Sequence, residues 1–358
     1  MPSPIPDRER AVYIVGAGLP SAFNLPNTPS LLQEVATFAG TAAGRWISQD
    51  AGLVDQLKEA YKFFYPDARY EGFQPDVVDF FSTLRTYLDI GVGLAGTGFQ
   101  HAPEMYRNLR RAVAHLLITR LRAVDETRFA SHQYLSEMIQ PGHIIVTSNW
   151  DLLVEHFCRL NGIPMRLGSI NRKMSTSHVT LLKLHGSIDW GQVSARPSGR
   201  PTSDYAALRE LQFGSPYTLA LPKKADELLR VRDVPLGFAW QQIKARLREP
   251  YIVTMATGKS DDLGPLLDVW KDAYSAISRA AHLHIVGYSM PPDDVEVRTL
   301  LRTGIQRGTS PPRVWVQNPA PDVHVRVRTY LTRAARVGGI AVCTRPGNDA
   351  CSLSGVSR

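Results

Sequence analysis

The sequence predicts a doubly wound α/β fold, in which helices cover both faces of a parallel sheet. Short apolar runs rich in β-branched residues recur along the 358 residues and end in small or polar residues, as strands buried on both faces do. Amphipathic helical patterns separate several of these runs, and this alternation is typical of doubly wound sheets. Two long segments without convincing strand patterns indicate insertions into the fold.

Seven runs carry the strand prediction. They are AVYIVGAG (11–18), HIIVTSN (143–149), VTLLKLH (179–185), YIVTM (251–255), HLHIVGYS (282–289), RVWVQN (313–318) and GIAVC (339–343). Each is short and apolar at consecutive positions, so we expect all of them to be buried strands of one parallel sheet.

Three helical patterns follow strands. The first begins near Pro29, a residue suited to a first helical turn. The second, DLLVEHFCRLNG, starts at Asp151 as a possible cap. The third, DDVEVRTLLRTG, offers Asp293 with Glu296 three residues later as a capping pair, and we expect it to stop at Gly304.

The insertions divide the chain into three parts. Residues 41–142 contain several amphipathic helix patterns and no convincing strand, so we expect a helical insertion subdomain there. Residues 191–245 predict a looser second insertion. The strand-bearing residues 1–40, 143–190 and 246–358 then form the main, Rossmann-like domain.

Composition and cysteine usage narrow the class of protein. Hydrophobic residues make up 44% and charged residues 21%, as in an ordinary globular chain. No apolar run approaches the roughly 18 residues that span a bilayer, and MPSPIPDRER lacks the apolar core of a signal peptide, so we expect a cytoplasmic protein without membrane contact. Cys158, Cys343 and Cys351 form no C-x-x-C pair, so we expect no zinc or other metal site.

Positive charge is concentrated towards the C-terminus. Residues 298–358 hold ten arginines, no lysine and two aspartates, which accounts for the whole net charge of +8. Such a surface can contact nucleic acid, an acidic partner or a phosphorylated ligand. We prefer the alternative of a solvated arginine-rich surface, because no aromatic interleaving or recognition motif accompanies the arginines.

Small and polar residues cluster directly after five of the predicted strands. The clusters are Gly16-Ala17-Gly18, Thr147-Ser148-Asn149-Trp150-Asp151, His185-Gly186-Ser187, Gly287-Tyr288-Ser289 and Gln317-Asn318. In a parallel sheet these ends lie at one edge, where ligands of α/β proteins bind.

The residue types in these clusters suit chemistry on a nucleotide, and each also has a structural explanation. Gly16 and Gly18 allow a backbone to approach a pyrophosphate, or they form a tight turn. The amide of Asn149 can orient a ribose hydroxyl or a water, or form a turn with Asp151. His185 titrates near neutrality and can exchange a proton with a hydroxyl or water, or it is a structural histidine.

The order of the clusters resembles that of sirtuin-like domains. GAG near the N-terminus, T-S-N-W-D, K-L-H-G-S and G-Y-S, followed by an Asn after the next strand, match the family forms G-A-G, T-x-N-x-D, L-H-G and G-x-S. The match is closest to bacterial domains of the defence type, whose strand ends commonly read T-N-Y-D, K-L-H-G and G-Y-S. It covers roughly residues 11–35, 143–190 and 250–320.

The resemblance implies a role for each matching residue. Asn149 and His185 are implied to be catalytic, with His185 as the base. The residues implied to contact NAD are Gly16, Ala17, Gly18, Asp151, Gly287, Ser289 and Asn318. For Asp151 the sequence itself favours a helix cap.

Two departures distinguish the chain from protein-deacylating sirtuins. Those enzymes carry two C-x-x-C pairs after H-G, whereas residues 186–250 contain no cysteine. They also carry an acidic-Phe-Arg element after G-A-G, whereas residues 24–28 are NLPNT. Both departures fit the zinc-free subgroup of the family.

The resemblance therefore implies an NAD glycohydrolase, a hydrolase that cleaves its substrate NAD to ADP-ribose and nicotinamide. By analogy it is an antiphage defence effector that depletes NAD and is controlled by homo-oligomerisation or by a partner such as an ATPase or sensor protein. The alternatives are an NAD-dependent protein deacylase or ADP-ribosyltransferase, and a non-catalytic subunit that binds NAD or ADP-ribose.

Overall fold

The computed structural model describes residues 11–39, 60, 63–65, 77–90, 102–168, 176–193, 218–220, 247–256, 263, 266–308, 311–331 and 340–343. Contacts within the chain divide it into two units. The first comprises residues 1–25, 123–186 and 266–358, and the second comprises residues 26–122 and 187–265.

A seven-stranded sheet forms the centre of the first unit. Its strands are β1 (Ala11–Val15), β2 (Ile144–Thr147), β3 (Met165–Leu167), β4 (Val179–Lys183), β8 (His282–Val286), β9 (Arg313–Gln317) and β10 (Ile340–Cys343). Their order is β10-β9-β8-β1-β2-β4-β3, and every neighbouring pair is parallel. The chain runs outward from β1 on one side and returns to β8 on the other, so the prediction of a doubly wound, Rossmann-like α/β fold is confirmed.

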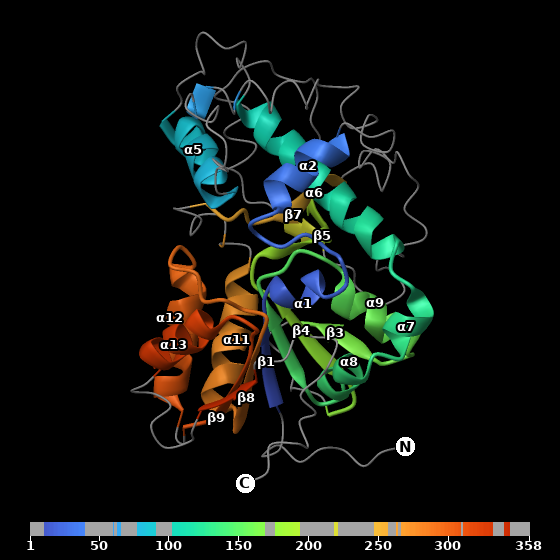
Figure 1. Cartoon of the computed structure of the whole chain (residues 1–358), viewed down its shortest axis with the longest axis vertical. Helices are drawn as coiled ribbons and strands as arrows, with labels where there is room; N and C mark the ends of the chain where they lie inside the picture. Colours follow the sequence, from blue (N-terminus) through green and yellow to red (C-terminus); the bar gives the residue numbers. More distant parts are fainter. Residues whose placement is uncertain are drawn as a thin grey trace. The chain divides into compact units, whose positions relative to one another are not determined.

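Helices cover both faces of this sheet. One face packs against α11 (Leu267–Arg279), α12 (Val295–Arg307) and α13 (Pro321–Leu331), which lie together in Figure 1. The other face packs against α1 (Gly18–Ser21), α7 (Glu126–Ala130), α8 (Gln133–Met138) and α9 (Leu153–Leu160). Successive residues of β1 alternate between the two cores, with Val12 in one and Tyr13 in the other, and this explains why the strands are continuously apolar.

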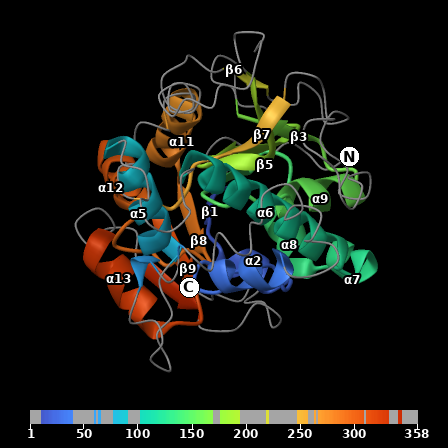
Figure 2. The same cartoon turned by 90° about the horizontal axis from the view of Figure 1, so that it is seen from above.

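The second unit combines helices with a small sheet. Its helices include α2 (Leu31–Ala39), α5 (Val77–Ile90) and α6 (Ala102–Arg122), and the sheet has the order β6-β5-β7, from β5 (Gly186–Val193), β6 (Thr218–Ala220) and β7 (Leu247–Ile252). Figure 2 shows α6 beside α2 and β7. The hydroxyls of Tyr106 on α6 and Thr254 after β7 are 2.5 Å apart and buried, which ties the long helix to the sheet.

The structure corrects three predictions about single elements. YIVTM (251–255) is not in the parallel sheet, because β7 belongs to the small sheet beside β5, and a short apolar run does not specify its partner strand. The helix α12 does not stop at Gly304 but continues to Arg307, because Gly304 lies against Ile277 of α11 and its missing side chain allows the close approach. Its N-cap is Asp294 rather than Asp293.

The unit boundaries also differ from the insertion boundaries that the sequence predicts. The helices α7 and α8, which fall within residues 41–142, belong to the first unit because Phe129 and Leu135 pack beneath β1 and β2. The helix α2, within residues 1–40, belongs to the second unit. Most of the second predicted insertion, residues 191–245, lies outside the described residues. Where the structure is described, no helix is long and apolar enough to cross a membrane.

A row of aromatic rings crosses the parallel sheet. The ring centroid of Tyr13 on β1 lies 5.3 Å from that of His143 and 4.6 Å from that of His284 on β8, with which it stacks. The ring of His284 in turn stacks on Trp315 of β9, with 4.7 Å between the centroids. Burial lowers the pKa of His284 to about 3, with further lowering from His282 and His143. The folded chain therefore holds His284 neutral.

We predict that His284 makes the fold sensitive to acid. The unfolded chain protonates this histidine below its ordinary pKa of 6.5, whereas the folded chain does so only near 3, so it lowers the free energy of unfolding by up to about 1.4 kcal/mol per pH unit between those values. Urea unfolding from about pH 6 to about pH 4 should show that His284→Phe, which keeps a ring in the stack, flattens this decline. The same substitution at His178, outside the row, is the control. An equal decline in the wild type and His284→Phe would contradict the prediction.

Candidate functional site at the carboxyl edge of the sheet

The five strand-end clusters come together at one edge of the parallel sheet. The strands that precede them, β9, β8, β1, β2 and β4, are consecutive neighbours and all parallel, so their carboxyl ends share that edge. The strand order reverses between β1 and β8, and a doubly wound sheet binds its ligands beside such a reversal. The fold thus places the GAG, T-S-N-W-D, L-H-G and G-Y-S segments around one region.

Three glycines at the reversal are required by contact between two backbones. The Gly18 amide donates to the Gly287 carbonyl at 2.9 Å, and the Gly16 amide donates to the Val286 carbonyl at 3.0 Å. A Cβ on Gly16 would lie 2.6 Å from the Tyr288 Cα, and one on Gly18 would lie 2.8 Å from the Gly287 Cα. This packing explains the glycines without reference to a ligand. Ala17, between them, is the N-cap of the four-residue helix α1.

Asn149 is fixed to the glycine loop by a chain of hydrogen bonds. Its Nδ2 donates to the Gly16 carbonyl at 3.0 Å, and its backbone amide donates to the Thr147 hydroxyl at 3.0 Å. That hydroxyl donates to the Val15 carbonyl at 2.9 Å. The amide group of Asn149 is therefore oriented by β1, and among the described residues its Oδ1 accepts no hydrogen bond.

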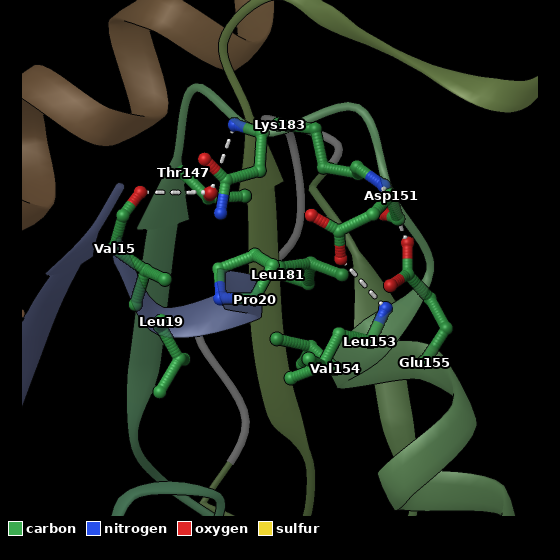
Figure 3. Close-up of a pocket in the computed structure, with 11 residues that line it drawn as sticks. Val15, Leu19, Pro20, Thr147, Asp151, Leu153, Val154, Glu155, Leu181 and Lys183 are labelled. Carbon is green, nitrogen blue, oxygen red and sulfur yellow. Dashed lines mark hydrogen bonds and ion pairs between the residues drawn. The ribbon is translucent and has the colours of Figure 1, made fainter. Parts of the chain in front are cut away.

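Asn149 and Asp151 line a pocket on the α1 and α9 face of the sheet. Figure 3 shows the pocket with an apolar wall and a polar end. The space that a water molecule could occupy there is about 10 Å³, and the lining residues are Val15, Leu19, Pro20, Thr147, Asn149, Asp151, Leu153, Val154, Glu155, Leu181 and Lys183. That volume has room for about one water molecule, whereas pockets that hold whole ligands are usually about 300 to 1,000 Å³, so a nucleotide can enter only if the lining residues move.

The polar end of the pocket contains a buried ion pair that the sequence analysis did not identify. The Lys183 Nζ lies 2.8 Å from the Glu155 Oε1, and both side chains are almost fully buried. The same ammonium group donates to the backbone carbonyls of Trp150 and Asp151. Lys183 thus holds the loop that follows β2 in place. Its signal in the sequence is a lysine inside the otherwise apolar run VTLLKLH, since a buried lysine requires partners.

Asp151 is not the N-cap of α9 that the sequence favours, because Leu152 holds that position, but Asp151 forms the turn that leads into the helix. Its Oδ1 accepts a hydrogen bond from the Leu153 amide at 2.8 Å, at the beginning of α9. Burial raises the pKa of Asp151 above its ordinary value, and the positive charge of Lys183 and two backbone hydrogen bonds oppose that rise. A raised pKa makes this carboxyl a possible hydrogen-bond donor as well as an acceptor.

His185 lies outside this pocket. It is 3% exposed, and its Nε2 lies 3.8 Å from the Oδ1 of Asp294. Its ring lies 6.2 Å from that of Trp270 on α11, so it is on the α11 side of the sheet. The structure therefore places the two predicted catalytic residues after adjacent strands, with Asn149 on the pocket and His185 beside a buried aspartate.

The other two predicted NAD contacts lie near α13. The Ser289 carbonyl accepts a hydrogen bond from Arg326 at 2.8 Å. The Asn318 Oδ1 accepts one from the Ala320 amide at 3.0 Å, and the Asn318 carbonyl is 2.6 Å from the Nε2 of His324. Asn318 therefore shapes the turn into α13 in this structure. Within the described residues, no group of three or more His, Cys, Asp or Glu side chains could hold a metal ion.

Fold and site together define a doubly wound, Rossmann-like α/β protein with a polar edge at its strand-order reversal. No family model matches the sequence, and no curated protein matches it significantly. Only the strand-end motifs therefore indicate a family for this chain.

We predict that Gly287→Ala is far more destabilising than Gly162→Ala. Both glycines have a left-handed backbone, with φ of 59° and 61°, so an alanine costs about 1–2 kcal/mol at either position. A Cβ on Gly287 would also overlap the backbone of Gly18 and Leu19, whereas Gly162 has open space. Urea unfolding should show an additional loss of several kcal/mol for Gly287→Ala. Equal losses would mean that the contact between the two loops is not rigid.

We also predict strong coupling between Lys183 and Glu155. Lys183→Met leaves a buried carboxylate without its cation and should lower the free energy of unfolding by about 3–5 kcal/mol. Adding Glu155→Leu removes that unpaired charge, so the double variant should be more stable than Lys183→Met alone. Urea unfolding of both single variants and the double variant measures the coupling. Additive losses would contradict it.

Proposed function

We propose that the chain is a sirtuin-like NAD glycohydrolase, which hydrolyses NAD to ADP-ribose and nicotinamide. One observation carries the proposal. Asn149 and His185 follow the adjacent strands β2 and β4, at the same edge as the glycine loops after β1 and β8 and beside the reversal of strand order. That is the region where doubly wound sheets bind nucleotides.

The chemistry of the reaction suits these residue types. Nicotinamide leaves NAD as a neutral molecule from a cationic linkage, so its departure needs little acid. The difficulty lies in stabilising an oxocarbenium-like ribose and in delivering water to it, which positioned polar groups can do. Water adds to the ribose carbon as the bond to nicotinamide breaks, and one proton is released.

Asn149 and His185 supply the two roles that this reaction needs. The Nδ2 of Asn149 is held by the Gly16 carbonyl, which leaves the Oδ1 to accept a hydrogen bond from a ribose hydroxyl or a water. His185 accepts the proton from a hydroxyl or from the attacking water, a contribution typically worth about two to four powers of ten in rate. Asp151, with its raised pKa, is suited to hydrogen bonding at the polar end of the pocket.

The described conformation limits access to these groups. His185 is 3% exposed, and the pocket beside Asn149 has room for about one water molecule. A dinucleotide needs more space, so turnover requires the site residues to rearrange. This supports an enzyme that is silent until it is activated, by self-assembly or by a partner such as an ATPase or sensor protein.

The same burial favours a second candidate function. A chain in which His185 never becomes accessible would bind NAD or ADP-ribose without turnover, as a non-catalytic subunit of a complex. Among the described residues, no feature of the site favours a protein deacylase or an ADP-ribosyltransferase. A role in antiphage defence through NAD depletion is part of the proposal and rests on the family resemblance.

Contact of the C-terminal arginines with nucleic acid is a separate proposal. Arg298 lies over the ring of Tyr330, and Arg326 pairs with Asp322, so part of this charge is used within the chain. A steep loss of affinity with rising salt would be its signature.

We predict that purified protein cleaves etheno-NAD, with a rise in fluorescence, and that His185→Ala and Asn149→Ala each lower the rate at least about a hundredfold. Both variants should remain folded by circular dichroism, although the loss of a buried ring and of a hydrogen-bonded amide lowers the midpoint of unfolding. The assay is run at several protein concentrations, since activation by assembly would raise the specific activity. His178→Ala is the matched control. Wild-type rates in either site variant would show that its assigned role is wrong, and binding without cleavage would favour the non-catalytic subunit.

A further inference from the structure

The loop between β8 and α12 places a buried carboxylate beside His185. Asp294, the N-cap residue of α12, is 5% exposed, and its Oδ1 is 3.8 Å from the His185 Nε2. Both side chains are buried, so water screens their interaction little. The nitrogen that faces the carboxylate is Nε2.

Asp294 is held from its other side by a tyrosine. The Tyr288 hydroxyl donates to the Asp294 Oδ2 at 2.8 Å, so the two carboxylate oxygens have separate neighbours. Burial, followed by the charge and hydrogen bond of Asp294, raises the pKa of Tyr288 well above its ordinary value. The phenol therefore stays protonated and keeps donating to the carboxylate.

The loop that carries both residues is fixed in an uncommon conformation. Met290 is fully buried and has a φ of 50°, a left-handed backbone that non-glycine residues rarely adopt. Arg326 donates to the Ser289 carbonyl at 2.8 Å, and Arg298 donates to the Pro292 carbonyl at 2.6 Å. Such strain persists only where surrounding contacts enforce it, and it is common at functional sites.

The backbone on the histidine side is fixed as well. The Trp270 Nε1 on α11 donates to the Leu184 carbonyl at 2.9 Å, directly before His185. Gly186, directly after it, has a φ of 76°, which lets the chain turn sharply at the end of β4. The position of the imidazole is thus set by the ends of β4, α11 and the loop before α12.

We propose that Asp294 is a positioning residue for His185, with Tyr288 as its anchor. The inference rests on the proposed hydrolase function and extends it. The carboxylate fixes the imidazole beside it, and the imidazole accepts a proton from water or from a ribose hydroxyl when it acts as the base. The resulting imidazolium is then stabilised by the negative charge beside it, as in other His–Asp pairs.

Other charged groups surround this arrangement. Asp293 and Arg298 act on the Tyr288 phenol in opposite senses, since Asp293 raises its pKa and Arg298 lowers it. Lys183, two residues before His185, contacts Glu155 on the opposite face of the sheet. Asp293 is therefore the matched control for Asp294, because it is the adjacent aspartate and carries the same charge.

The first test measures the titration of His185 directly, by NMR of the full chain labelled at its histidine rings. The His185 signal is identified by its loss in His185→Gln. We expect Asp294→Asn to move the midpoint of this titration at least about one pH unit lower, a tenfold loss of proton affinity, because the stabilising carboxylate is gone. Asp293→Asn should move it much less. An unchanged midpoint in Asp294→Asn would overturn the inference.

Tyr288→Phe keeps the buried ring and removes only the hydroxyl that binds Asp294. It therefore tests the same inference if Asp294→Asn does not fold. Loss of the anchor should shift the His185 midpoint in this variant, and a midpoint equal to that of the wild type would count against the inference.

In the etheno-NAD assay, Asp294→Asn should lower kcat about tenfold or more with little change in KM, and should move the acidic limb of the pH profile by the same step that NMR shows. A wild-type protein without turnover would contradict the proposed function, while the NMR titration would still decide whether Asp294 acts on His185.

Discussion

The backbone contact between the loops after β1 and β8 is the constraint on which the carboxyl edge depends. These strands are neighbours where the strand order reverses, so their loops leave the sheet side by side and meet without side chains between them. The contact fixes the carbonyl of Gly16, and that carbonyl holds the amide of Asn149. It also fixes Gly287, from which the loop to Asp294 begins. Both parts of the candidate site therefore depend on the close approach of these two loops.

The sheet separates the polar groups of the edge onto its two faces. Lys183 and Glu155 pair on the α9 face, and His185 and Asp294 face each other on the α11 side. Buried charge is costly unless it is paired, so each face satisfies its charges locally. The lysine holds the loop that carries Asn149, whereas the aspartate faces the histidine. Lys183 is the last residue of β4 and His185 lies two residues further on, so the segment at the end of this strand supplies both faces.

The main sheet and the place of the edge could be predicted from the sequence because the relevant signals are local. Six of the seven predicted runs are strands of the parallel sheet, and runs apolar on both sides indicate burial between two helical layers. The run YIVTM lies in the small sheet instead, because its composition suits either sheet and only the pairing partner decides. Gly304 was interpreted as a helix end because glycine often follows helices, yet the close packing of α11 against α12 accounts for it.

The sequence by itself determined which polar groups follow the strands, because strand length and the small residues after each strand are written in consecutive positions. It therefore identified Gly16, Asn149, His185 and Gly287 as residues of one edge. Only the tertiary structure decided what those groups contact. The partnership of His185 with Asp294 joins residues more than a hundred positions apart, and the glycines proved to accommodate each other's backbone. Such pairings depend on strand order and helix packing, which no local pattern encodes.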